Sequence, residues 1–111
     1  MIGLQQIKSH LSNCMDVLGE VLQSGFIAVS EDTLNKLKFL SQGSGQRGLS
    51  QLETYLNELY EALSGMKHQM KRDKESEKAL MELFCKIRRY LELGIDKISY
   101  DEVKFDMVFL E

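Results

Sequence analysis

The side chains that could bind a metal ion or act as soft nucleophiles are few and widely spaced along the chain. They are two histidines and two cysteines: His10, Cys14, His68 and Cys85. His10 and Cys14 are four residues apart, so on a helix both could face one ion. His68 and Cys85 have no such neighbour, whereas zinc sites pair their ligands in two close clusters. We therefore expect no metal site and no cofactor.

Catalytic motifs are also missing from the sequence. No serine stands in a nucleophile-elbow or triad context. The glycine-rich stretch 43–48 precedes a predicted helix, but it lacks the preceding strand and the Gly-Lys-Ser/Thr ending of a phosphate-binding loop. Cys85 is expected off the apolar stripe of its helix, near Arg88 and Arg89. It is a candidate reactive thiol, but the sequence predicts that the protein is not an enzyme.

Charge is distributed unevenly along the chain. The 111 residues include 14 basic and 17 acidic side chains, a net charge of -3, which gives no overall attraction to nucleic acid. Residues 67–89, however, carry eight basic and four acidic side chains. A nucleic-acid-associated accessory role would use five of these basic residues: Lys71, Arg72, Lys74, Arg88 and Arg89. No aromatic residues alternate with them to stack on bases, so a solvated basic face is the favoured interpretation.

Apolar residues at steps of three and four predict two helices in the first half of the chain. The first runs from Leu4 to Leu22 and ends at Ser24-Gly25, followed by an apolar connector at 26–29. The second begins at Ser30, whose hydroxyl can cap the first turn. We expect residues 42–48, which include three glycines, to form a non-helical hinge.

Two further helices are predicted after the hinge. Ser50 and Glu53 have capping-box spacing at the start of the third helix, which is amphipathic to about Met70. Residues 71–78 contain no apolar side chain and fit either a polar loop or a solvated helix. The fourth helix buries Leu80 to Leu91 and is expected to end at Gly94.

The last segment, residues 95–111, allows two interpretations. Ser99 and Glu102 have capping-box spacing, which favours a short helix. Val103, Phe105, Met107 and Phe109 alternate with other residues, which is typical of a strand. A strand would need a second chain or the sheet edge of a partner.

Residues 25–63 resemble a helical segment of bacterial proteins of the SWIM zinc-finger family. The resemblance rests on Gly25-Phe26, on the leucines of the second helix, and on Gly48-Leu49 opening a longer leucine helix. The Cys-x-Cys and Cys-x-His signature of that family is absent, because Cys14 and Cys85 stand alone. The resemblance therefore implies only an accessory helical part, with no zinc or nucleic-acid role for any residue.

Together these patterns predict a single all-α domain, a four-helix bundle of two antiparallel hairpins with a C-terminal short helix or strand. The expected parts are a hairpin at 1–41, a hinge at 42–48, a hairpin at 49–94 and a C-terminal segment at 95–111. We expect a cytoplasmic, non-catalytic module that binds a protein partner, since no signal-peptide or membrane-spanning pattern appears. The expected contact residues are the C-terminal apolar cluster (Phe105, Val108 and Phe109), which could also mediate homo-oligomerisation, and the five basic residues above.

Overall fold

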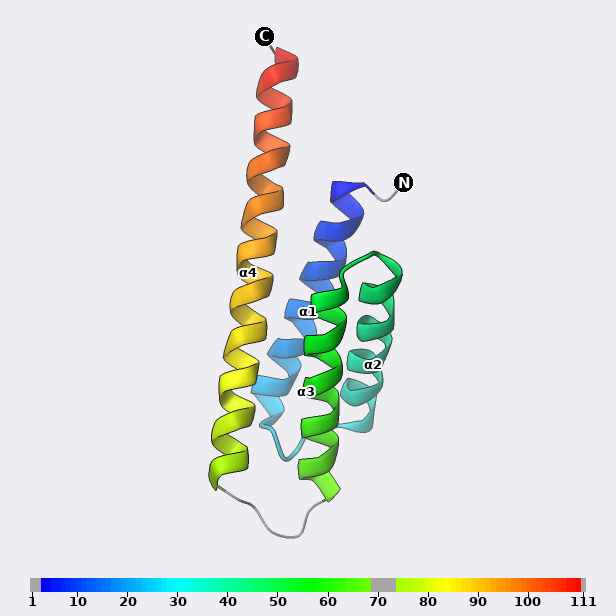
Figure 1. Ribbon diagram of the computed structural model, residues 1–111, viewed down its shortest axis with the longest axis vertical. Coiled ribbons are helices and arrows are strands. Elements are labelled where there is room, and N and C mark those ends of the chain that lie inside the picture. The colour runs from blue at the N-terminus through cyan, green and yellow to red at the C-terminus, as the bar shows by residue number, and fades with distance from the viewer. Residues whose placement is uncertain (1–2, 69–73, 111) are drawn as a thin grey trace.

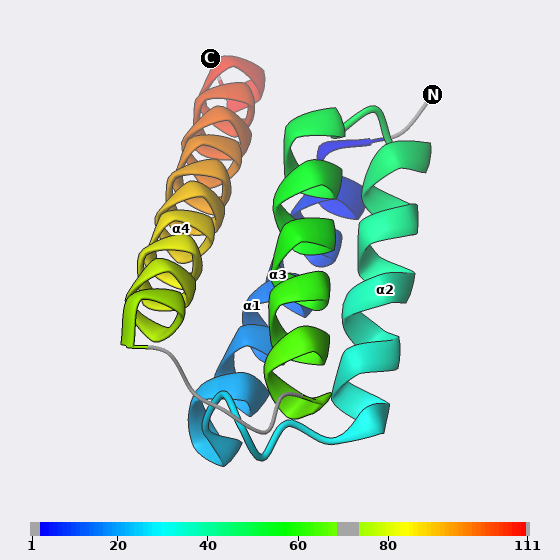
Figure 2. The same cartoon turned by 60° about the horizontal axis from the view of Figure 1, so that its bottom comes forward.

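The computed structural model describes residues 3–68 and 74–110, and side chains through Lys67 and from Lys74 to Tyr100. These residues form four α-helices and no strand (Figure 1). The helices are α1 (Leu4–Ser24), α2 (Glu31–Gln46), α3 (Ser50–His68) and α4 (Lys74–Leu110). Each helix runs antiparallel to its two neighbours, so the predicted all-α bundle is confirmed. Figure 2 shows α3 between α2 and α4, and α1 contacts α2 and α4.

The end of α1 and the start of α2 lie at the residues that the sequence predicted. Gly25, with φ 84°, ends α1, and its N–H donates to the carbonyl of Val21 at 2.9 Å. Ser30 caps α2, because its Oγ accepts a hydrogen bond from the N–H of Thr33 at 3.1 Å. Each of these two hydrogen bonds joins residues only three or four positions apart, so the local sequence was sufficient to predict both helix ends.

The predicted hinge at 42–48 is wrong for most of its length. Helix α2 continues through Gly43 and Gly45 to Gln46, and the turn into α3 occupies only residues 47–49. A Cβ on Gly43 would lie 3.3 Å from the ring of His10, and a Cβ on Gly45 would overlap the carboxylate of Glu53. These glycines therefore permit close packing against α1 and α3 instead of breaking the helix.

Gly94 is a second glycine that the sequence led us to misinterpret. Helix α4 continues through it from Lys74 to Leu110, so the fourth helix does not end there and residues 95–110 are not a strand. A Cβ on Gly94 would lie 3.1 Å from Cδ1 of Leu11, which shows that α4 approaches α1 closely at this point. Residues 74–78 are helical, which fits the solvated-helix interpretation, while residues 71–73 lie outside the described residues.

Buried leucines from all four helices form the core, together with Phe84 and Ile87 of α4. The ring of Phe84 contacts that of Phe26 with centroids 5.6 Å apart, so the apolar connector after α1 packs onto the core. Tyr55 of α3 meets Tyr90 of α4 edge to face, also at 5.6 Å. The four leucines of α3 with no exposed area lie at the centre, and they are Leu52, Leu56, Leu59 and Leu63.

Helix α4 is longer than the bundle. Because Gly94 lies opposite Leu11 and the two helices are antiparallel, Leu4, the first residue of α1, lies opposite position 101. Residues 101–110, which we call the C-terminal extension, continue the helix beyond that level (Figure 1). The molecule is correspondingly elongated, at 62 × 22 × 21 Å. Across the described chain, every helix is too short or too polar to span a bilayer.

Candidate functional site

The potential metal ligands with described side chains do not form a cluster, and the side chain of His68 lies outside the described residues. Cys14 is fully buried in the core, and burial raises the pKa of its thiol to about 12, although the charge of Arg47 opposes this rise. His10 is also buried, and its ring is hydrogen-bonded to Ser44. Cys85 is exposed on α4. Among the residues with described positions, no three potential metal ligands form a cluster.

His10 and Ser44 form a buried polar network with the carbonyl of Leu40, and the half-buried Arg47 lies close to it. Oγ of Ser44 donates to the carbonyl of Leu40 at 2.8 Å and lies 2.7 Å from Nε2 of His10. A hydroxyl has one proton, so Nε2 must be the donor to Ser44. Burial lowers the pKa of His10, and the nearby charge of Arg47 lowers it further. The ring is therefore held in its neutral form.

This histidine–serine pair cannot activate the serine as a nucleophile. A catalytic base must accept the hydroxyl proton, whereas Nε2 of His10 donates to Ser44. Ser44 also has no exposed area that a substrate could reach. The guanidinium of Arg47 donates to the carbonyl of Gly43 at 2.9 Å, which fixes it beside the network. The arrangement joins α1 to the end of α2.

The three predicted basic residues with described positions do not form one compact patch. Lys74, Arg88 and Arg89 are exposed on α4, while Lys71 and Arg72 lie outside the described residues. Lys74 and Arg88 are separated by about 21 Å along the helix, at 1.5 Å per residue. Nε of Arg88 donates to Glu92 at 3.1 Å, so part of its charge is neutralised on its own helix.

The predicted apolar cluster lies on the C-terminal extension. At 100° per residue, positions 105 and 109 fall within about 20° of Ile98, which is buried against the bundle. Position 108 falls in line with Tyr90, on the side of α4 that faces α3. The sequence stripe that packs α4 into the core therefore continues past the level at which α1 begins.

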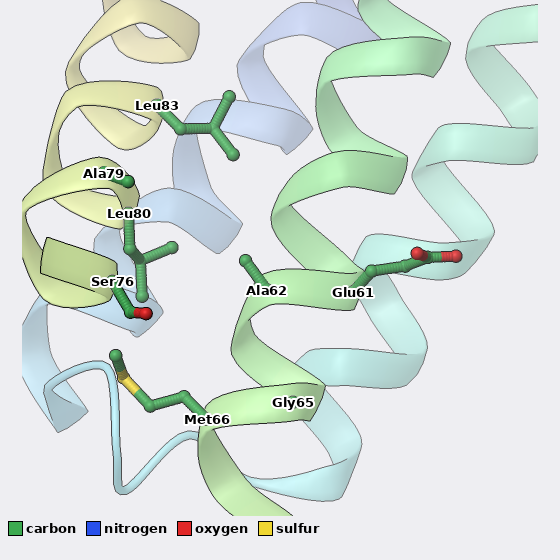
Figure 3. A pocket seen from close by; sticks show the side chains of 8 residues that line it. All are labelled: Glu61, Ala62, Gly65, Met66, Ser76, Ala79, Leu80 and Leu83. Carbon is green, nitrogen blue, oxygen red and sulfur yellow. The ribbon is translucent and has the colours of Figure 1, made fainter. Parts of the chain in front are cut away.

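A groove between α3 and the first turns of α4 was not foreseen from the sequence (Figure 3). It has a volume of about 350 Å³ and is lined largely by small and apolar side chains. The lining residues are Glu61, Ala62, Gly65 and Met66 of α3 and Ser76, Ala79, Leu80 and Leu83 of α4. The sequence does contain the small residues that line this groove. It does not show that they face one another, because that depends on the pairing of α3 with α4.

Comparison with protein-family models, with curated proteins and with solved structures gave no match. The resemblance of residues 25–63 to a SWIM-family helical segment therefore stays an untested prediction.

Proposed function

We propose that this protein is a non-catalytic interaction module that binds a protein partner through α4. The observation that carries the proposal is the continuation of the core-facing stripe of α4 into the C-terminal extension. Ten residues of helix, about three turns, extend past the start of α1 and include Phe105, Val108 and Phe109. A regular amphipathic helix with apolar positions at such spacing is a common binding element for another helix.

The energetics favour this role. Burying one phenylalanine or valine side chain contributes about 1.5–3 kcal/mol, so three such residues can contribute substantially to an interface. Among the residues with described side chains, the core reaches along α4 as far as Ile98. The helix that continues past the start of α1 offers these apolar positions to a partner.

The groove between α3 and α4 supplies a second binding element. Its small residues, including Gly65 and Ala79, leave room for larger side chains from a partner. Leu80 and Leu83 give it an apolar surface, and Figure 3 shows Met66 and Ala62 projecting toward α4 from the opposite wall. Knobs from a neighbouring helix could enter this groove as they enter the holes of a coiled coil.

Nucleic-acid binding is the competing function. It would rest on the basic residues of α4, whose spacing is described above. A titration with labelled DNA and RNA at two salt concentrations tests it, because affinity based on phosphate contacts falls steeply with salt. Salt-sensitive binding that is lost on reversing Arg88 and Arg89, but not on changing Phe105, would favour this function over ours.

Site-specific photo-crosslinking in cells tests the proposed function. A photoreactive phenylalanine analogue replaces Lys97, which is exposed on α4 and falls within about 20° of position 108, or Phe39, which is 74% exposed on α2, as the control. We expect protein adducts at position 97 that disappear when Phe105, Val108 and Phe109 are all changed to serine, and no such dependence at position 39. Adducts that form equally in the serine variant, or none at position 97, would contradict the proposal.

A further inference from the structure

One side of α4, between its core-facing residues and solvent, carries a regular seam. In the first half of the helix the seam positions are Ala79, Leu83, Lys86 and Tyr90, which follow each other at steps of four and three. In the second half they are Lys97, Asp101, Lys104 and Val108, at the same steps. Leu93 and Gly94 lie between the two halves. This spacing is the heptad pattern by which helices pair side by side.

The seam is accessible on the bundle. Ala79, Lys86 and Lys97 are exposed, and Leu83 and Tyr90 are half-buried. Leu93 is 54% exposed, a high value for a leucine in the middle of a long helix. The groove beside Ala79 lies at the N-terminal end of the seam, and the C-terminal extension lies at its other end.

Charge along α4 favours one orientation of a partner helix. Residues 74–91 carry five basic and three acidic side chains, whereas residues 92–110 carry two basic and five acidic ones. An antiparallel copy of α4 brings the positive half of each helix against the negative half of the other. A parallel copy would align like charges, which is unfavourable.

Three of the four kinds of seam pair are complementary in one antiparallel register, and the fourth places Lys104 opposite Leu83. When Val108 of one copy lies opposite Ala79 of the other, Asp101 lies opposite Lys86, and the two symmetric positions repeat these pairs. In the same register Lys97 lies opposite Tyr90, where an ammonium group can face an aromatic ring. At the centre, Leu93 of each copy then lies opposite Gly94 of the other copy.

We infer that the partner bound by α4 is a second copy of this chain, with the two α4 helices antiparallel about a two-fold axis near Leu93 and Gly94. This inference rests on the proposed function and identifies the partner. Each C-terminal extension lies along the groove between α3 and α4 of the other copy, so both grooves are filled in one closed dimer. A head-to-tail contact would fill one groove per pair and leave the next one open for further copies.

Sedimentation equilibrium of the full chain and of charge-reversed variants tests the inference. We expect the natural sequence to form a dimer of twice 12.8 kDa. Lys86→Asp and Asp101→Lys should each raise the dissociation constant roughly tenfold or more, since each places like charges opposite one another. The double variant should return to within about threefold of the natural value, because the pair is restored in reverse.

Lys78→Asp is the matched control. It makes the same charge change on an exposed residue of α4, but at 100° per residue it lies about 80° around the helix from Lys86. We expect it to leave the dissociation constant within about threefold of the natural value. Thermal unfolding of each variant shows that the bundle is retained, since Lys86 also lies 5.2 Å above the ring of Tyr55.

A chain that stays monomeric up to about 1 mM would overturn the inference. So would a double variant that dimerises as weakly as the two single variants. The proposed function fails separately, because the photo-crosslink at position 97 reports any protein partner. If the chain is monomeric and gives adducts with a different protein, the proposed function stands and the second copy is rejected. A dimer without adducts at position 97 would show association by another surface.

Discussion

The ring of His10 and the hydroxyl of Ser44 are joined by a hydrogen bond of 2.7 Å between residues 34 positions apart. Nε2 of the imidazole donates it, because the hydroxyl proton of Ser44 is directed to the carbonyl of Leu40. Both side chains are buried, at 5% and 0% exposure, so the bond fixes α1 against the last turns of α2. Either the neutral or the charged ring can donate this bond, and burial together with the charge of Arg47 favours the neutral ring by lowering the pKa of His10.

Protein stability should therefore depend on pH through His10. The pKa of His10 is lowered from 6.5 by burial and by the charge of Arg47, so the unfolded chain takes up a proton at a higher pH than the folded one. The contribution of the neutral ring is complete above pH 6.5 and decreases as the pH falls through the lower folded pKa. Urea unfolding at a series of pH values measures this decrease.

His10→Gln is the control for that measurement. The glutamine amide can donate to Ser44 but does not titrate, so the difference in unfolding free energy between the two proteins should vary with pH below 6.5. Parallel pH profiles for the two proteins would show that His10 is not the group responsible.

Two glycines in helix interiors should respond differently to alanine. Gly19 on α1 has open space where a Cβ would lie, so Gly19→Ala should raise the free energy of unfolding by about 0.5–1 kcal/mol. Gly45→Ala should gain less or lose stability, because the new Cβ displaces the carboxylate of Glu53. In a Glu53→Ala background the two substitutions should have similar effects. Thermal and urea unfolding measure these differences, and an equal gain at both glycines in the natural background would contradict the packing described for α2.

The two cysteines should differ in reactivity. Cys85 is exposed, whereas Cys14 is fully buried with a thiol pKa of about 12. A thiol reagent at pH 8 should modify one cysteine per folded chain rapidly, and the second only when the chain is unfolded. A Cys85→Ser variant should lose the fast reaction. Rapid modification of Cys14 in that variant would mean that α1 packs less tightly than described.

The centre of the bundle should be sensitive to loss of side-chain volume. Leu56→Ala removes a fully buried side chain and should lower the free energy of unfolding by about 2–5 kcal/mol. Leu93→Ala, on the exposed seam of α4, should change the unfolding of the monomer by less than about 1 kcal/mol while weakening association. Chemical unfolding at low protein concentration separates the two effects. Comparable losses for both variants would place Leu93 in the core.

Local signals were sufficient to predict much of the fold. The spacing of leucines predicted all four helices, and Ser30 and Gly25 marked two of their ends correctly. Gly43, Gly45 and Gly94 were misinterpreted, because a glycine can end a helix or allow another helix to approach, and only the neighbouring helix decides between these. The same limit applies to the candidate site. The apolar character of Phe105, Val108 and Phe109 was evident, but the groove at Ala79 exists only where α3 and α4 meet.

Disulfide crosslinking between copies tests the central claim most directly. In a full chain with Cys85→Ser, the pair Ala79→Cys and Val108→Cys is about 44 Å apart along one helix, so any disulfide between the two positions must join two chains. Mild oxidation should convert this variant to covalent dimers, while Ala79→Cys with Met107→Cys, about 100° around the helix from position 108, should react far less. Equal crosslinking in both variants, or monomers alone in the first, would contradict the antiparallel pairing of α4.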